Sequence, residues 1–254
     1  MGETVPRALA EFFAEHPRVA LAYSGGVDSA YLLYAARACG CDVAAYCVKS
    51  AFQPGFELED ARRLAVSLGA ALHVIEVDAL KDPEVRANPA DRCYYCKRNL
   101  FTTLIACARN EGFNTVIDGT NASDDAGDRP GMRALRELGV LSPLRLCGIT
   151  KAEVRAYSKE AGLFTWDKTA YACLATRVPT GEEITAEKLS RVEGAEAALF
   201  SLGFTDFRVR LFHDAARLQL PAAQIESAAR RRGEIRAALK PFFDVILMDT
   251  MDRG

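Results

Sequence analysis

The chain has 254 residues, half of them apolar, and a formal net charge of −2 from 32 basic and 34 acidic side chains. A chain of this length can bury one large core and a smaller second one. The balanced charge gives no general attraction to phosphates, which disfavours a nucleic-acid partner. No apolar stretch approaches the roughly 20 residues that cross a bilayer, and residues 1–7 have no hydrophobic signal core. We therefore expect a cytoplasmic protein with neither a membrane nor a nucleic-acid partner.

Short apolar runs alternate with helical patterns along the first 120 residues. Strands are predicted at 19–23, 43–48, 72–77 and 115–118, and helices at 30–38, 57–68 and 97–109. This alternation indicates a parallel sheet with helices on both faces, and such sheets bind ligands beyond the carboxyl ends of their strands. The segments at those ends are 24–29, 49–50 and 118–121.

The remaining sequence predicts a second, smaller domain. Thr150 and Glu153 have the spacing of a capping box, and the helix that they open runs to Gly162. Residues 164–183 show no periodicity, as is common for a functional loop. Further elements are predicted in the order helix, two paired strands, helix and closing strand: from Thr185 to Gly203, then 207–211, 217–220, 225–239 and 242–248. We predict an α/β fold with domains at 1–180 and 181–254, the second being a small α/β domain.

A glycine-containing loop, Ser24-Gly25-Gly26-Val27-Asp28-Ser29, lies directly between the first predicted strand and the first predicted helix. Gly25 and Gly26 allow a tight turn with accessible N–H groups, and the following helix offers its positive end to a phosphate chain. Ser24 and Ser29 add hydroxyl donors, and Asp28 can hold a magnesium ion. No lysine follows the glycines, which excludes a Walker motif. The pattern favours a pyrophosphate site over a simple turn.

Eight cysteines lie in a chain expected to be in a reducing compartment, so disulfides explain them poorly. Five of them lie in or beside apolar runs and are predicted to be small core residues: Cys39, Cys41, Cys47, Cys107 and Cys147.

The other three cysteines form a pattern suited to ligation. Cys93 and Cys96 are separated by two residues just before a predicted helix, and Cys173 lies in the irregular segment. A two-residue spacing lets two thiolates reach one metal or one corner of an iron–sulfur cluster, and a distant third can complete the set. Three alternatives stay open: zinc with His73 or His213 as fourth ligand, unligated thiols, and a redox-active pair.

The phosphate loop alone resembles the PP-loop of the ATP pyrophosphatase superfamily. Together with five other segments it resembles more closely the LarE family of ATP-dependent sacrificial sulfur transferases. The segments are 24–29, 88–97, 118–121, 128–131, 173–181 and 207–210. The resemblance implies an adenine-nucleotide-hydrolase-like parallel sheet for the larger domain.

The resemblance also implies a reaction. Its substrate is pyridinium-3,5-biscarboxylic acid mononucleotide, whose carboxylates are converted to thiocarboxylates in two rounds of adenylation by ATP, with Mg²⁺, and sulfur insertion. One branch of the family sacrifices a cysteine, at the place of Ala172 here, whereas the other has three cysteines and a 4Fe–4S cluster that delivers added sulfide. Cys93, Cys96 and Cys173 imply the second branch, with an external sulfide source. Family members form homo-oligomers, including hexamers.

Roles for further residues follow from the same resemblance. Ser24, Gly25, Gly26, Asp28 and Ser29 are expected to hold ATP, and a second group is expected to bind ATP or substrate: Lys97, Gly119, Arg129, Arg177, Arg208 and Arg210. Arg208 and Arg210 lie on one face of a predicted strand and resemble the family's substrate-phosphate arginines, although an exposed charged strand is an alternative. Arg129 can instead anchor its loop. Glu196 resembles a metal-binding acid, but its usual acidic partner falls near Ser227.

Two other functions fit parts of the pattern. A PP-loop tRNA thiolation enzyme can share the loop and the three cysteines, but it needs a basic RNA-binding surface. A non-catalytic, zinc-stabilised nucleotide-binding protein would bind ATP without forming AMP.

Overall fold

A computed structural model describes residues 4–124, 129–169 and 171–251. Its contacts divide the chain into two compact units, the first comprising Met1–Ala79 with Asp91–Ala170 and the second Leu80–Ala90 with Tyr171–Gly254. Residues 171–180, which the sequence analysis assigned to the N-terminal domain, therefore belong to the second unit, as does the short segment 80–90. Asp128 of the 128–131 motif lies outside the described residues.

The first unit contains the predicted parallel sheet. Its strands are β1 (Arg18–Ala22), β2 (Asp42–Lys49), β3 (Ala71–Glu76) and β4 (Val116–Ile117), arranged in the order β3-β2-β1-β4 and all parallel. β1 is a central strand, and its register pairs Ala22 with Tyr46 on one side and Leu21 with Ile117 on the other. Loops that follow β1, β2 and β4 therefore meet at one edge of the sheet, as predicted.

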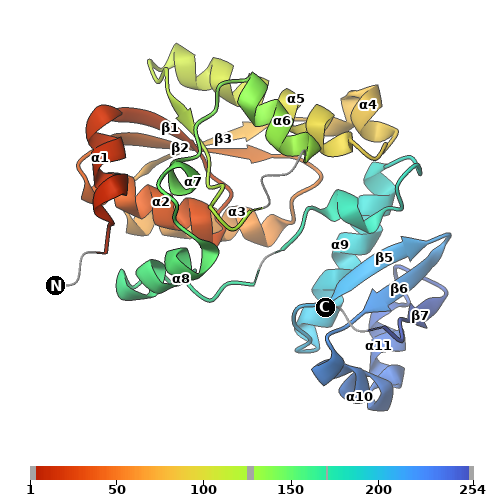
Figure 1. Cartoon of the computed structure of the whole chain (residues 1–254). Coiled ribbons are helices and arrows are strands. Elements are labelled where there is room, and N and C mark those ends of the chain that lie inside the picture. The colour runs from red at the N-terminus through yellow and green to blue at the C-terminus, as the bar shows by residue number, and fades with distance from the viewer. Residues whose placement is uncertain (1–3, 125–128, 170, 252–254) are drawn as a thin grey trace. The chain divides into compact units, whose positions relative to one another are not determined.

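Helices cover both faces of this sheet, which confirms the predicted fold class (Figure 1). Side chains alternate along β1, so that Val19 and Leu21 enter one core and Ala20 enters another. The first core is closed by α1 (Arg7–Glu15), α2 (Val27–Ala38), α3 (Gly55–Ser67), α7 (Pro143–Leu146) and α8 (Lys151–Glu160). The second is closed by α5 (Arg92–Asn110) and α6 (Pro130–Glu137). Burial of one large apolar side chain in either core contributes about 1.5–3 kcal/mol.

Local signals explain where several of these helices begin. The capping box that opens α8 is present: Glu153 N donates to Thr150 Oγ1 at 3.3 Å, and Thr150 N donates to Glu153 Oε2 at 2.8 Å. Helix α5 begins at Arg92, five residues before the predicted start, so Cys93 and Cys96 lie within it rather than before it. The sequence analysis missed α1, α6 and α7, which are nine, eight and four residues long.

The second unit is a small α/β domain, as predicted. Strand β5 (Arg208–Phe212) pairs antiparallel with β6 (Ala215–Gln219), and β7 (Ile246–Met248) pairs parallel with β6. Its other elements are 3-10 helices and helices: η1 (Ala79–Lys81) at the boundary of the two units, α4 (Pro83–Arg86), η2 (Leu174–Arg177), α9 (Ala186–Ser201), α10 (Ala222–Arg230) and α11 (Arg232–Leu239). The helix predicted at 225–239 is therefore two helices, because the chain turns at Arg231 with φ −93° and ψ 17°.

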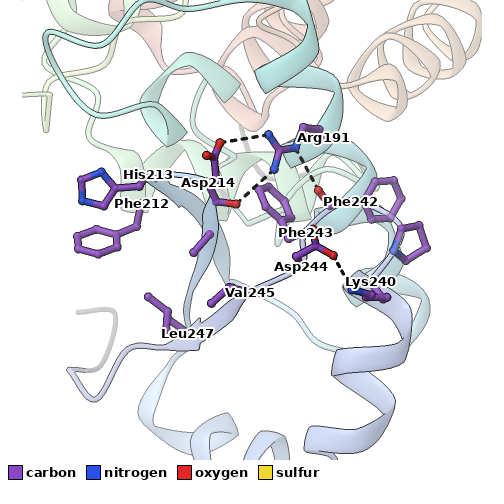
Figure 2. A pocket seen from close by; sticks show the side chains of 12 residues that line it. Arg191, Phe212, His213, Asp214, Lys240, Phe242, Phe243, Asp244, Val245 and Leu247 are labelled. Atoms are coloured by element: carbon purple, nitrogen blue, oxygen red, sulfur yellow. Dashed lines mark hydrogen bonds and ion pairs between the residues drawn. The ribbon is translucent and has the colours of Figure 1, made fainter.

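A surface hollow of about 810 Å³ lies beside the β5–β6 turn (Figure 2). Arg191 donates to the carbonyl oxygens of Phe242 at 3.1 Å and Asp214 at 3.3 Å, so α9 holds the turn and the segment before β7 together. Phe212 and Leu247 are exposed along this hollow. None of the helices in the described ranges is long and apolar enough to cross a bilayer.

Candidate functional site

The phosphate loop closes on itself through its two serines. Ser24 N donates to Ser29 Oγ at 3.3 Å, and the two hydroxyl oxygens lie 3.2 Å apart. Ser29 Oγ also donates to Gly26 O at 3.2 Å. Gly26 is the N-cap of α2, so the loop leads directly into the first turn of that helix. The amide groups at a helix N-terminus favour a negatively charged ligand, as the sequence analysis expected.

Two glycines allow the loop to lie against its neighbours. Gly25 has φ +72°, and a Cβ there would lie 3.0 Å from both Ala61 Cβ and the carbonyl oxygen of Glu57. A Cβ on Gly119, after β4, would lie 3.0 Å from the amide nitrogen of Ser29. Only glycine fits at these two positions without displacing backbone.

Two lysines reach the loop from distant parts of the chain. Lys151 Nζ lies 2.5 Å from Asp28 Oδ2, and Asn121 Nδ2 donates to Asp28 Oδ1 at 3.2 Å. Lys168 Nζ lies 2.8 Å from Asp60 Oδ2 and donates to Gly25 O at 3.4 Å. The sequence analysis missed both lysines, because they follow the loop by 123 and 143 residues. The sequence signal that locates Lys151 is the capping box, which sets it in the first turn of α8.

The loop after β4 is held by Asp118, which is buried. Thr120 Oγ1 donates to Asp118 Oδ2 at 2.5 Å, and Ser142 Oγ donates to Asp118 Oδ1 at 2.6 Å. These bonds fix the backbone that carries Gly119 and Asn121, and hence the contact with the phosphate loop. At the end of β2, by contrast, Lys49 Nζ bonds to Gln53 O at 2.5 Å, which closes a local turn.

A cavity of about 350 Å³ opens above the loop. Its polar side includes Ser24, Asp28, Ser29, Lys97 and Gly119, and its apolar side includes Ala22, Tyr46, Val48, Leu100, Phe101 and Leu104. This combination of a phosphate-type loop with an apolar wall suits a nucleotide.

A second cavity of about 330 Å³ shares lining residues with the first. Lys97, Thr120 and Asp124 line both, and Cys93 and Arg129 line the second. A Cβ on Gly131 would lie 3.1 Å from Lys97 Cδ, so the start of α6 lies against the lysine side chain. The structure therefore brings Lys97, Gly119, Arg129 and Cys93 to the region of the phosphate loop.

The eight cysteines divide by exposure. Cys41 and Cys47 are buried, and burial raises the pKa of each thiol to about 11, so both are protonated core residues as predicted. Cys107 and Cys147 pack against the two cores. The prediction for Cys39 is wrong: it is exposed at the C-terminal end of α2.

The three cysteines predicted as ligands are accessible. Cys93 is exposed and Cys96 is half-buried. Because the two cysteines are three positions apart in the helix, they lie on one side of α5. Cys173 is exposed and belongs to the second unit. Within the described ranges, no three His, Cys, Asp or Glu side chains form a group that could hold a metal ion. Ligation by these cysteines therefore stays a prediction.

The remaining predicted residues lie in the second unit. Arg177 and Glu196 are both buried and form an ion pair with Arg177 Nε 2.7 Å from Glu196 Oε1. Arg210 Nε donates to Gln219 Oε1 at 2.6 Å, and Arg210 Nη1 donates to Thr176 O at 2.8 Å. Arg208 shares a face of β5 with Arg210 and is half-buried. The structure gives Arg177, Glu196 and Arg210 bonds within the unit, and their predicted roles toward a ligand are untested.

A parallel sheet flanked by helices, with this loop after its central strand β1, defines an α/β protein of the PP-loop-like class. No protein-family model matches the chain. The chain is 37% identical, over 82% of its length and 76% of the relative's, to the pyridinium-3,5-bisthiocarboxylic acid mononucleotide synthase of Lactiplantibacillus plantarum. The chain therefore belongs to the family of that synthase, the LarE family.

Two uncharacterized proteins are also similar to this chain. One, from Synechocystis sp., is 43% identical over 86% of this chain and 82% of its own length. The other, from Methanocaldococcus jannaschii, is 29% identical over 81% of this chain and 79% of its own length.

Proposed function

We propose that this chain inserts sulfur into the carboxylates of pyridinium-3,5-biscarboxylic acid mononucleotide, with ATP as the activating substrate. Membership of the synthase family supports the product, since the name of the Lactiplantibacillus relative specifies the bisthiocarboxylic acid. The observation that carries the proposal is a pair of adjacent cavities: Cys93 lines the one that shares Lys97 and Thr120 with the cavity over the phosphate loop.

The first step is adenylation. A substrate carboxylate oxygen bonds to the α-phosphorus of ATP while the bond to the β-phosphate oxygen breaks, and pyrophosphate leaves. Asp28 and Ser29 in the first turn of α2 line the cavity where this charge develops, as does Lys97, and fixed donors at a helix N-terminus stabilise such a transition state. Lys151 adds a positive charge beside Asp28. Asp28 is the expected Mg²⁺ contact, and that ion would help neutralise the departing pyrophosphate.

The second step is substitution at the activated carbonyl carbon. Hydrosulfide forms a bond to that carbon, its proton passes to solvent, and AMP leaves with the original carboxylate oxygen. Repetition at the second carboxylate gives the bis-thiocarboxylate. Each round consumes one ATP and one sulfide and releases one AMP and one pyrophosphate.

The family resemblance implies a 4Fe–4S cluster, and Cys93, Cys96 and Cys173 would hold it; the thiols of Cys93 and Cys173 are exposed and that of Cys96 is half-buried. When bound, the cluster would supply hydrosulfide from the iron that has no protein ligand. The buried thiols of Cys41 and Cys47 are unsuitable, because burial favours their protonated form.

The reaction is tested by supplying the anaerobically purified protein with ATP, Mg²⁺, sulfide and the pyridinium biscarboxylate mononucleotide. We expect AMP and pyrophosphate to appear in equal amounts with each replacement of oxygen by sulfur, measured by mass spectrometry. ATP binding without AMP formation would overturn the proposal in favour of a nucleotide-binding protein. Tight, salt-sensitive binding of bulk tRNA would favour a tRNA thiolation enzyme instead.

The cluster is tested separately by iron and sulfide analysis. We expect about four irons per chain, lost in Cys93→Ala, Cys96→Ala and Cys173→Ala. Cys39→Ala is the matched control, since Cys39 is also exposed, and it should retain iron. Stoichiometric zinc in place of iron would reject the cluster while leaving adenylation to be judged by AMP release.

A further inference from the structure

A buried ion pair in the second unit lies next to the turn that carries Cys173. The side chains of Arg177 and Glu196 are 1% and 2% exposed. Arg177 Nε lies 2.7 Å from Glu196 Oε1, and Arg177 Nη2 lies 3.2 Å from Glu196 Oε2. A charge so deeply buried is tolerated only where its polar atoms are bonded to partners, so each bond to this carboxylate matters to the fold of the turn.

Both oxygens of Glu196 are occupied by donors. Oε1 accepts from Arg177 Nε and from the backbone N of Val209 at 2.9 Å. Oε2 accepts from Arg177 Nη2 and from the Tyr171 hydroxyl. Burial, and then the Glu196 carboxylate, raise the pKa of Tyr171, which keeps this hydroxyl protonated and able to donate. A carboxylate has about four acceptor sites, so a metal ion at Glu196 would have to displace one of these donors.

Two of the three residues that donate to Glu196, Tyr171 and Arg177, flank Cys173 in the chain. Tyr171 precedes it by two residues and Arg177 follows it by four. Arg177 Nη1 also donates to Ala172 O at 3.2 Å and to Thr176 Oγ1 at 2.9 Å. Thr176 in turn donates to Cys173 O twice, from its backbone N at 2.9 Å and from Oγ1 at 2.8 Å. The backbone on both sides of Cys173 is thus tied to one carboxylate, while the cysteine itself is exposed.

We propose that Glu196 is a positioning residue whose carboxylate holds residues 171–177 in one conformation and so presents the Cys173 thiol for ligation. This inference rests on the proposed function, in which Cys173 is a cluster ligand. In this proposal the Glu196 carboxylate bonds to the turn, whereas the family resemblance implied a metal-binding role for it. A preorganised thiol binds its ligand without first having to order the turn, whereas a loose turn must be ordered on binding.

Two variants loosen the turn by different amounts. Tyr171→Phe removes one donor and leaves the ion pair intact, whereas Glu196→Gln keeps the side-chain shape and removes its charge. Glu187→Gln is the matched control, because it makes the same chemical change at an exposed position in the first turn of the same helix. Leu199→Ala, a buried position of α9, controls for a general loss of stability.

The first measurement is amide hydrogen exchange in the iron-free protein. We expect exchange across residues 172–177 to be about tenfold faster in Tyr171→Phe and faster still in Glu196→Gln, since a bond to a charged group is lost. In the two controls, Glu187→Gln and Leu199→Ala, the ratio of the exchange rate of the turn to that of the rest of the second unit should equal the wild-type ratio.

The second measurement is the rate at which a chelator removes iron from the reconstituted protein. We expect about tenfold faster release from Tyr171→Phe than from wild type, with Glu187→Gln unchanged. Wild-type exchange rates across residues 172–177 in Tyr171→Phe would overturn the proposal, as would tight Mn²⁺ binding that Glu196→Gln abolishes. Absence of iron in wild type would count against the cluster in the proposed function, whereas the exchange data decide the role of Glu196 in either case. If Glu196→Gln does not fold, Tyr171→Phe alone gives the answer.

Discussion

Glu57 provides a direct test of how the phosphate loop is packed. It lies in the first turn of α3, and its carbonyl oxygen lies against Gly25. Burial raises the pKa of its carboxyl group from 4.5 to about 7, and the nearby ammonium groups of Lys168 and Lys49 only partly oppose this rise. The folded protein therefore prefers Glu57 neutral, and ionisation near neutral pH destabilises it.

The sign and size of the effect follow from linkage. Below pH 4.5 the carboxyl group is neutral in both the folded and the unfolded chain, so its contribution to stability is fully present. That contribution is lost as the pH rises through about 7, where the folded form ionises. A rise of this size corresponds to at most about 3.4 kcal/mol, and we expect about 1–2 kcal/mol because the side chain is only partly buried.

Glu57→Gln isolates this contribution, since glutamine mimics the neutral acid at every pH. We expect the variant and wild type to have similar free energies of unfolding at pH 5, and the variant to be more stable by about 1–2 kcal/mol at pH 8.5. Urea denaturation followed by the fluorescence of Trp166, the single tryptophan, reports on the first unit. Glu59→Gln, at an exposed position of the same helix, is the control. A stability difference that does not change with pH would refute the reasoning.

Three further substitutions test particular contacts. Gly119→Ala would place a Cβ 3.0 Å from the Ser29 amide nitrogen. We expect the free energy of unfolding to fall by about 1–3 kcal/mol and ATP to bind more weakly in calorimetry. An unchanged Kd would contradict the close contact. Gly194→Ala would place a Cβ 2.3 Å from the Phe242 ring. In urea denaturation we therefore expect it to destabilise wild type but to stabilise a Phe242→Ala variant by about 1 kcal/mol. A change in the free energy of unfolding of the same sign in both backgrounds would argue against the contact. Lys168→Gln removes the ammonium group that donates to Gly25 O. We expect the KM for ATP to rise about tenfold in this variant and to recover partly in Lys168→Arg. Equal KM values in wild type and both variants would show that this bond does not order the loop.

Patterns that are local in sequence were sufficient for much of the fold. The alternation of apolar runs predicted β1 to β4 and their helices, since strand and helix periods differ. The capping residues Thr150 and Thr185 marked the starts of α8 and α9, because an N-cap bond spans only three residues. The Ser24–Ser29 loop was also recognisable, because the residues that bond to one another in it lie within six positions of the sequence.

Contacts between distant segments were decided by tertiary structure alone. Nothing near Lys151 or Lys168 in the sequence indicates that they bond to Asp28 and Gly25, since only the packing of α8 and the segment after it brings them there. The bonds that Glu196 makes were likewise decided by tertiary structure, because Arg177 and Tyr171 reach its carboxylate from another part of the chain. Sequence motifs record which groups are present, whereas their charge state and partners depend on what the folded chain places around them.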